Sequence, residues 1–152
     1  MKTHVLYKML AVLLLIVAIP AADAAGRKIN LNLEDAMKRM DLAELLAKKS
    51  IALFWADQIP SRAIEKEIST DTYSRGANAT LKSDLRACSN AFENRVETLI
   101  EDAEKFGANA IIGIRSYHDE LPDFSSETEY RCDVGAFRAS VGFRVRFVQL
   151  AP

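Results

Sequence analysis

The chain has few of the side chains from which metal centres and nucleophilic active sites are usually built, with two cysteines and two histidines among 152 residues. None of its six glycines is followed by Lys-Ser or Lys-Thr, so the phosphate-binding loop of nucleotide hydrolases is missing. The formal net charge of −1 shows no excess of basic residues of the kind that attracts nucleic acid. We therefore expect no cofactor and no nucleic-acid partner.

Long apolar runs are also scarce, and the one that stands out is short and lies near the start, at residues 9–19. A transmembrane helix needs about 20 apolar residues, so this segment is too short to span a bilayer. Basic residues precede it, Pro20 ends it, and an Ala-Asp-Ala triplet ending at Ala24 suits a signal peptidase. We predict a secretory signal peptide, residues 1–24, cleaved after Ala24; an uncleaved N-terminal anchor is the alternative.

The exported product would run over residues 25–152, a typical size for one domain. No cysteine lies near the cleavage site, so a bacterial lipid anchor has no attachment point. Cleavage leaves 18 basic and 20 acidic residues, and no later segment is apolar enough to cross a membrane. We expect a single soluble domain, periplasmic or secreted, without a transmembrane segment.

Both cysteines, Cys88 and Cys132, fall in the exported part. An even number of cysteines in an oxidising compartment indicates a disulfide. The bond would close a loop of about 44 residues, which is worth about 4 kcal/mol in the chain-entropy model. Cys88 lies on the apolar stripe of a predicted helix and Cys132 on the apolar side of a predicted strand, so packing of the two elements could join the sulfurs. Two unpaired buried thiols are the alternative.

One long amphipathic helix is predicted at 84–106, with Ser83 as its cap and Gly107 at its end. Before it, the pattern predicts two short helices, or one kinked helix. The first begins after Asn32, and the second begins after Asp41 and ends near residue 49. The apolar positions of the long helix recur in steps of three and four: Leu85, Cys88, Phe92, Val96, Leu99, Ala103 and Phe106.

Strands are predicted from alternating or continuous apolar residues. Residues 50–56 are apolar on both faces, which is typical of a central strand covered on both sides. The other predicted strands are an edge strand at 63–73, an inner strand at 110–117 and two closing strands at 127–134 and 137–150, with loops at 74–80 and 118–126. The fold class is α+β: a mixed or antiparallel sheet of four to five strands, the long amphipathic helix on one face and the short N-terminal helices on the other.

The last strand presents three arginines, Arg138, Arg144 and Arg146, on its outward face, whereas Phe137 through Phe147 alternate inward. Glu127 and Glu129 on the preceding strand would pair with these arginines across the sheet, worth about 0.2–1 kcal/mol each. The alternative is acid/base chemistry, because two carboxylates two residues apart could stand about 7 Å apart. The arginine face could instead bind an anionic polymer or a membrane surface, although aromatics for stacking bases are lacking.

Cleavage would leave His118 as the one histidine, too few for a multi-histidine metal site. Ser116, His118 and Asp119 have the composition of a catalytic triad, but neighbours in sequence rarely converge as nucleophile, base and orienting group. We predict that His118 is a solvent-exposed loop residue. We assign no catalytic residue, no cofactor-binding residue and no metal ligand.

Three segments together resemble a family of small exported proteobacterial proteins of unknown function, which often carry the label excinuclease ATPase subunit. They are residues 54–58, 106–112 and 126–136, and the resemblance covers most of the exported part. Residues 107–115 are similar, more weakly, to the YbjQ-type family, described as heavy-metal-binding, and to the Rcs envelope-stress lipoprotein. These likenesses imply a module in which a helix precedes a sheet, and the Rcs likeness implies a sensor that works through protein contacts.

We expect a non-enzymatic exported (periplasmic) binding or envelope-associated module of unknown ligand, whose partner is a protein or an envelope component. The alternative is a metal- or redox-binding protein that uses Cys88 and Cys132.

Overall fold

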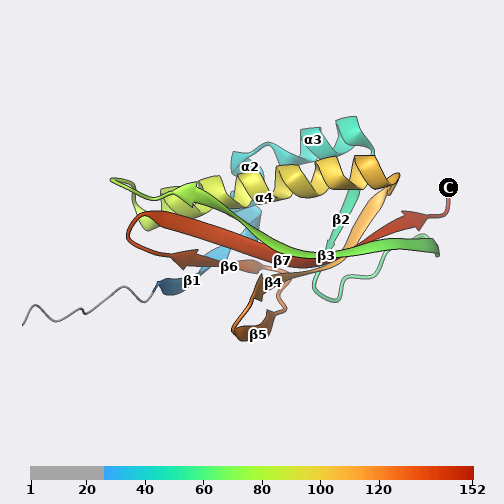
Figure 1. The fold of residues 1–152 in the computed structure, drawn as a ribbon. Coiled ribbons are helices and arrows are strands. Elements are labelled where there is room, and N and C mark those ends of the chain that lie inside the picture. Colours follow the sequence, from blue (N-terminus) through green and yellow to red (C-terminus); the bar gives the residue numbers. More distant parts are fainter. Residues whose placement is uncertain (1–25) are drawn as a thin grey trace, which may run out of the picture.

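The structure is a computed structural model that describes residues 26–152, so the predicted signal peptide lies outside the described residues. Three helices and seven strands follow one another in this part of the chain (Figure 1). Their order is β1 (Arg27–Asn32), α2 (Leu33–Arg39), α3 (Leu42–Lys49), β2 (Ala52–Trp55), β3 (Ile64–Asn78), α4 (Asp84–Phe106), β4 (Ala110–His118), β5 (Leu121–Phe124), β6 (Glu129–Val134) and β7 (Arg138–Leu150).

Strand β7 organises the sheet because other strands pair with both of its edges. β3 runs antiparallel to it over almost its whole length and occupies one edge. β4 and β6 pair antiparallel with two successive parts of β7 and therefore share the other edge. β2 extends the sheet beside β4 in parallel, β1 lies antiparallel to β6, and β5 folds back on β4.

The predicted fold class, an α+β domain with a sheet of four to five strands, is wrong in the number of strands. Over residues 26–152 the sheet has seven, because pattern analysis misses β1 and β5. β1 alternates Ile29 and Leu31 with polar residues but is only six residues long, and β5 spans four residues that include Pro122. Strands this short carry too little periodicity to be distinguished from loops. The predicted loop at 118–126 therefore contains β5.

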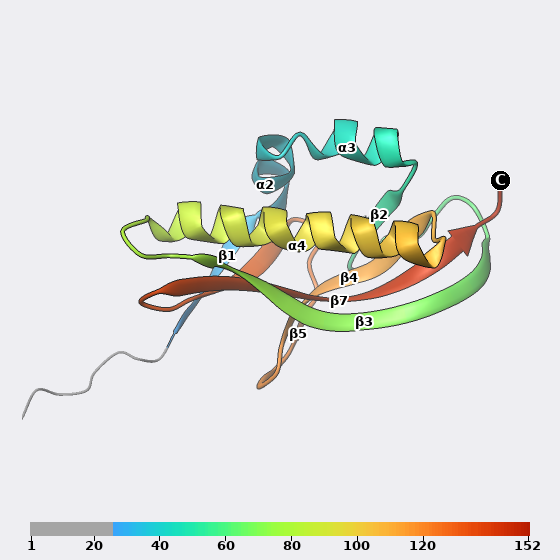
Figure 2. The same ribbon diagram turned by 45° about the horizontal axis from the view of Figure 1, so that its top comes forward.

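The placement of the short helices is wrong as well, because α2, α3 and α4 all lie over the same face of the sheet (Figures 1 and 2). α2 follows β1 without a linker and packs beside α4, where Arg39 donates a hydrogen bond of 2.8 Å to Ser89. Lys49 at the end of α3 pairs with Glu104 of α4 at 2.9 Å. We call the opposite side of the sheet the open face; on β7 it carries the outward side chains of Arg138, Ser140, Arg144 and Arg146.

Strand β2 is terminal in the sheet and pairs with β4, so the central position predicted for residues 50–56 is wrong. Both of its sides are still covered by apolar groups. Leu53 and Trp55 pack into the core under the helices, whereas Ala52 and Phe54 pack against a second cluster. That cluster lies on the other side of the sheet and consists of Ala110, Ile112, Val148 and Leu150.

Strand β3 confirms the predicted edge strand but continues to Asn78, through most of the loop predicted at 74–80. The residues added are mainly polar, and their own preference for a strand is weak. These residues still form a strand because β7 provides a hydrogen-bonding partner for each of them, as far as Arg138 opposite Asn78. Phe137 lies just before β7 and is 77% exposed, so its predicted inward position is wrong.

Helix α4 has the bounds expected from its pattern. The Ser83 hydroxyl accepts a hydrogen bond from the Arg86 N–H, and Gly107 ends the helix with φ at 70°. The buried side of the helix packs on the sheet through an aromatic cluster formed with other elements. Its members are Phe92 of α4, Trp55 of β2, Tyr130 of β6 and Phe143 of β7.

Gly113 makes a β-bulge in β4 that changes which side chains face the helices. Its φ is 62°, a left-handed conformation that favours glycine. Three residues of β4 advance while β7 advances by two, because Ile112 lies opposite Arg146 and Arg115 lies opposite Arg144. Ile111 and Ile114 therefore both reach the core, and Arg115 turns to the open face instead of the interior.

Candidate functional site

The open face is the side of the sheet on which a ligand could be bound, because the helices cover the other side. Two projections rise from it in Figure 1, the connection between β2 and β3 and the hairpin of β4 and β5. A groove of about 470 Å³ lies beside the β2–β3 connection, with β3, β4 and β7 forming the rest of its lining. We call this the arginine groove, after Arg115, Arg144 and Arg146 that line it.

The pairing register of β4 with β7 places the three arginines next to one another. Arg115 of β4 lies directly opposite Arg144 of β7, and Arg146 follows two residues along β7 on the same side. Like charges that face each other across a sheet are destabilising in themselves. Each arginine is paired with a carboxylate from a different element: Arg115 with Asp57 at 2.6 Å, Arg144 with Asp123 at 3.3 Å and Arg146 with Glu67 at 3.3 Å.

These pairs correct the prediction that Glu127 and Glu129 pair with the arginines of the last strand. β6 pairs with β7 only near Ser140 and Ala139, and the edge of β6 near Glu129 faces β1. The carboxylates that do reach the arginines stand on β3, on β5 and in the β2–β3 connection. Loop residues such as Asp57 give no periodic signal, so the sequence pattern could not identify them.

Arg144 also stacks over the ring of Tyr117, with its guanidinium carbon 5.0 Å from the ring centre. The Tyr117 hydroxyl donates a hydrogen bond to Asp119. That hydrogen bond, with burial second, raises the pKa of Tyr117 because ionisation would remove the donated proton. The stacking fixes Arg144 between an aromatic face and the Asp123 carboxylate.

A second hollow of about 480 Å³ lies nearby and includes His118 and Asp133. His118 Nε2 stands 3.6 Å from the Asp133 carboxylate, and its Nδ1 accepts a hydrogen bond of 3.1 Å from the Glu120 N–H. Lys28 of β1 approaches the same carboxylate at 3.7 Å. His118 is the last residue of β4 and its side chain is 23% exposed, so the predicted exposed loop position is wrong.

The three residues with triad composition do not come together. Ser116 is buried, and its hydroxyl accepts a hydrogen bond of 2.9 Å from the Arg131 N–H of β6. Asp119 contacts Tyr117, and His118 contacts Asp133. The serine therefore has a structural partner in place of the histidine that a triad requires.

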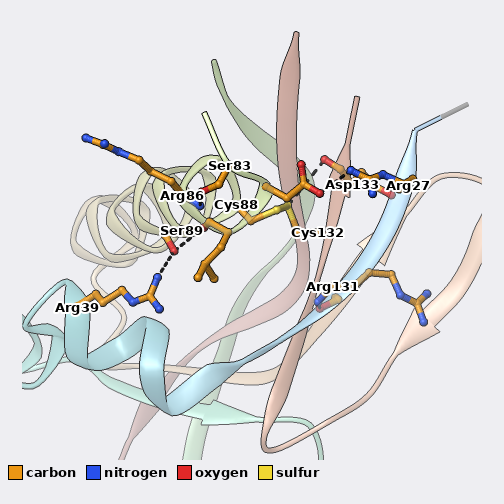
Figure 3. Close-up of a disulfide and its surroundings, with 12 residues drawn as sticks. Arg27, Arg39, Ser83, Arg86, Cys88, Ser89, Arg131, Cys132 and Asp133 are labelled. Carbon is orange, nitrogen blue, oxygen red and sulfur yellow. Dashed lines mark hydrogen bonds and ion pairs between the residues drawn. A yellow bond between two sulfur atoms is a disulfide. The ribbon is translucent and has the colours of Figure 1, made fainter. Parts of the chain in front are cut away.

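A disulfide joins Cys88 of α4 to Cys132 of β6, with Cα atoms 5.9 Å apart (Figure 3). The predicted bond is thus present, and both residues are fully buried. Neither sulfur is available as a thiolate ligand while the bond is closed. Within residues 26–152 no three His, Cys, Asp or Glu side chains gather in a way that could hold a metal ion. In the same residues, no helix has the length and apolar character needed to cross a membrane.

Neither a scan against models of known protein families nor a search of curated proteins finds a match for this chain.

Proposed function

We propose that the chain is an exported, non-enzymatic binding module that contacts its partner with the open face of the sheet. The observation that carries this proposal is the one-sided arrangement of the fold, with all three helices of the described part on one face. The other face presents paired charges and a groove lined by β3, β4, β7 and the β2–β3 connection. Concave, partly apolar sites with a few convergent polar groups are where proteins usually bind ligands.

The side chains on this face support binding better than acid/base chemistry. Tyr117 and His118 could transfer protons, but the Tyr117 hydroxyl is engaged with Asp119, and the neighbouring Ser116 is buried and bonded to the Arg131 N–H instead of to His118. The arginines of the groove are permanent cations and act as recognition groups. Turnover of hydrolase substrates that is lost in Glu129→Gln would contradict the non-enzymatic part of the proposal.

The buried disulfide supports an exported location, because such bonds persist in oxidising compartments. With the signal peptide predicted at residues 1–24, we place the protein in the periplasm. A partner in that compartment would be another exported protein or a component of the envelope.

Photo-crosslinking in cells tests the proposal. A benzophenone amino acid replaces Thr70, which lines the groove, or Glu97, which is exposed on α4. The two positions are both solvent-accessible but lie on opposite sides of the sheet. We expect a reproducible crosslinked partner from position 70 and none from position 97. Crosslinks to that partner from position 97 alone, or equally from both positions, would contradict the use of the open face.

A further inference from the structure

We propose that the arginine groove binds a phosphate group, carried either by a lipid headgroup or by a small soluble molecule. This inference rests on the proposed function and names the chemistry of its binding face. It starts from the juxtaposition of Arg115, Arg144 and Arg146 along two neighbouring strands.

The juxtaposition is a local arrangement that folding alone does not favour. Arg115 and Arg144 face each other across the sheet, where like charges repel. The bulge at Gly113 brings Arg115 to this position, since a regular strand would turn the side chain toward the core. Arrangements of side chains that reduce local stability are typical of functional sites. Their carboxylate partners offset this repulsion in the structure, and a bound anion would replace those partners as a shared counterion.

The charged groups that line the groove favour an anion. Among the titratable residues that line it, three arginines stand against Asp57, which leaves a formal charge of +2. Glu67 and Asp123, the other two carboxylate partners, are not part of the lining. Each lies 3.3 Å from its arginine, so the three arginines and their three partners together are formally neutral, while the charged groups that face the groove are mostly guanidinium groups.

The arginines keep donors available despite their carboxylate partners. Each of the three contacts is made through one terminal guanidinium nitrogen, whereas a guanidinium carries five N–H donors. The arginine side chains are between 41% and 49% exposed. Exposed ion pairs of this kind contribute about 0–1 kcal/mol, so a ligand can exchange with them.

The number of donors favours phosphate over carboxylate. One planar guanidinium satisfies a carboxylate with two parallel hydrogen bonds. Three guanidinium groups around one groove suit a tetrahedral group that has several acceptor oxygens and up to two negative charges. The lining also has an apolar part, with Ile59 87% exposed and Pro60 and Ile64 in the same lining. These apolar residues would contact the uncharged part of the ligand.

Binding is tested on the purified, disulfide-bonded protein with two probes. Inorganic pyrophosphate is titrated while amide shifts are followed by NMR, and sedimentation is measured with vesicles of phosphatidylglycerol or of phosphatidylcholine. The variant is Arg146→Gln. The matched control is Arg138→Gln, which removes the same charge from the same face of β7 outside the groove.

We expect saturable shifts in β4 and β7, or sedimentation with phosphatidylglycerol but not phosphatidylcholine vesicles. Arg146→Gln should weaken the interaction at least about tenfold, and Arg138→Gln should leave it almost unchanged. A response to pyrophosphate identifies a soluble phosphate source, and a response to anionic vesicles alone identifies a headgroup. No response to either probe, or equal losses in the two variants, would overturn the inference. Crosslinking from position 70 would then still support the binding module, so the two failures are distinguishable.

Discussion

At the scale of single residues, the most consequential side chain is Arg95 of α4, a fully buried cation that pairs with Asp71 of β3 at 2.8 Å. A buried charge that loses its counterion is strongly destabilising. Asp71→Asn should therefore lower the free energy of unfolding by about 2–3 kcal/mol, a little less than usual because Asp71 keeps some contact with water. Urea denaturation followed by circular dichroism measures this change.

Glu67→Gln is the matched control for that experiment, because Glu67 lies on the same strand and also pairs with an arginine. Its pair is exposed on both sides, so the free energy of unfolding should change by less than about 1 kcal/mol. If the two substitutions lowered the free energy of unfolding equally, burial of Arg95 would not be the reason why loss of its carboxylate partner is destabilising.

Tyr130 gives a prediction about pH. Burial in the aromatic cluster raises the pKa of Tyr130 to about 12, whereas a tyrosine in the unfolded chain ionises near pH 10. The folded state thus holds the proton more tightly, and this contribution is complete below pH 10 and is lost as the pH rises toward 12. At about pH 11 the free energy of unfolding should have fallen by roughly 1 kcal/mol from this group.

Tyr130→Phe separates this effect from other alkaline changes, because it keeps the ring and removes the ionisable hydroxyl. Urea denaturation at about pH 8 and pH 11 should show a larger loss for the wild type than for the variant. Identical losses would mean that Tyr130 ionises equally easily in both states.

At the scale of elements, Gly113 determines which of the following side chains of β4 face the core and which face the groove. An added Cβ would meet nothing nearer than Arg146 Nε at 3.8 Å, so the cost of substitution is conformational. Gly113→Ala should lower the free energy of unfolding by about 1 kcal/mol, because its φ of 62° is left-handed. Gly113→Asn should lower the free energy of unfolding by less than Gly113→Ala, since asparagine tolerates the left-handed conformation. Thermal denaturation ranks the three proteins, and an alanine variant as stable as the wild type would refute the role of the bulge.

The bulge also shows why sequence reasoning identified part of the groove and not all of it. Strict alternation correctly turned Arg144 and Arg146 outward on β7. The same alternation applied to β4 turns Arg115 toward the core with Ile111, because the extra residue at Gly113 is not visible in a period of two. α4 was predictable to its caps since its apolar stripe repeats over 23 residues. β1 was not, because it is short and its partner β6 is distant in sequence. β5 was not either, because four residues that include Pro122 carry too little periodicity even for a strand that pairs locally with β4.

At the scale of the whole molecule, the disulfide links the helical layer to the sheet across 44 residues of chain. Loss of the bond in Cys88→Ala/Cys132→Ala should lower the free energy of unfolding by about 4 kcal/mol in the chain-entropy model. The melting temperature should fall accordingly in oxidising buffer, and wild type reduced in denaturant and refolded with reductant should melt like the variant. Equal melting of both proteins in both buffers would contradict a stabilising role.

Strand β7 has a further consequence for how the polypeptide reaches its final state. Its principal neighbours, β3, β4 and β6, all precede it along the chain, and the segment opposite Arg138 lies 60 residues earlier. Pairing between such remote segments is slow, because a large loop must close before any contact rewards it. None of these neighbours can pair with β7 until residues 138–150 have emerged, so the nascent chain lacks the strand that joins β3, β4 and β6 into one sheet until that moment.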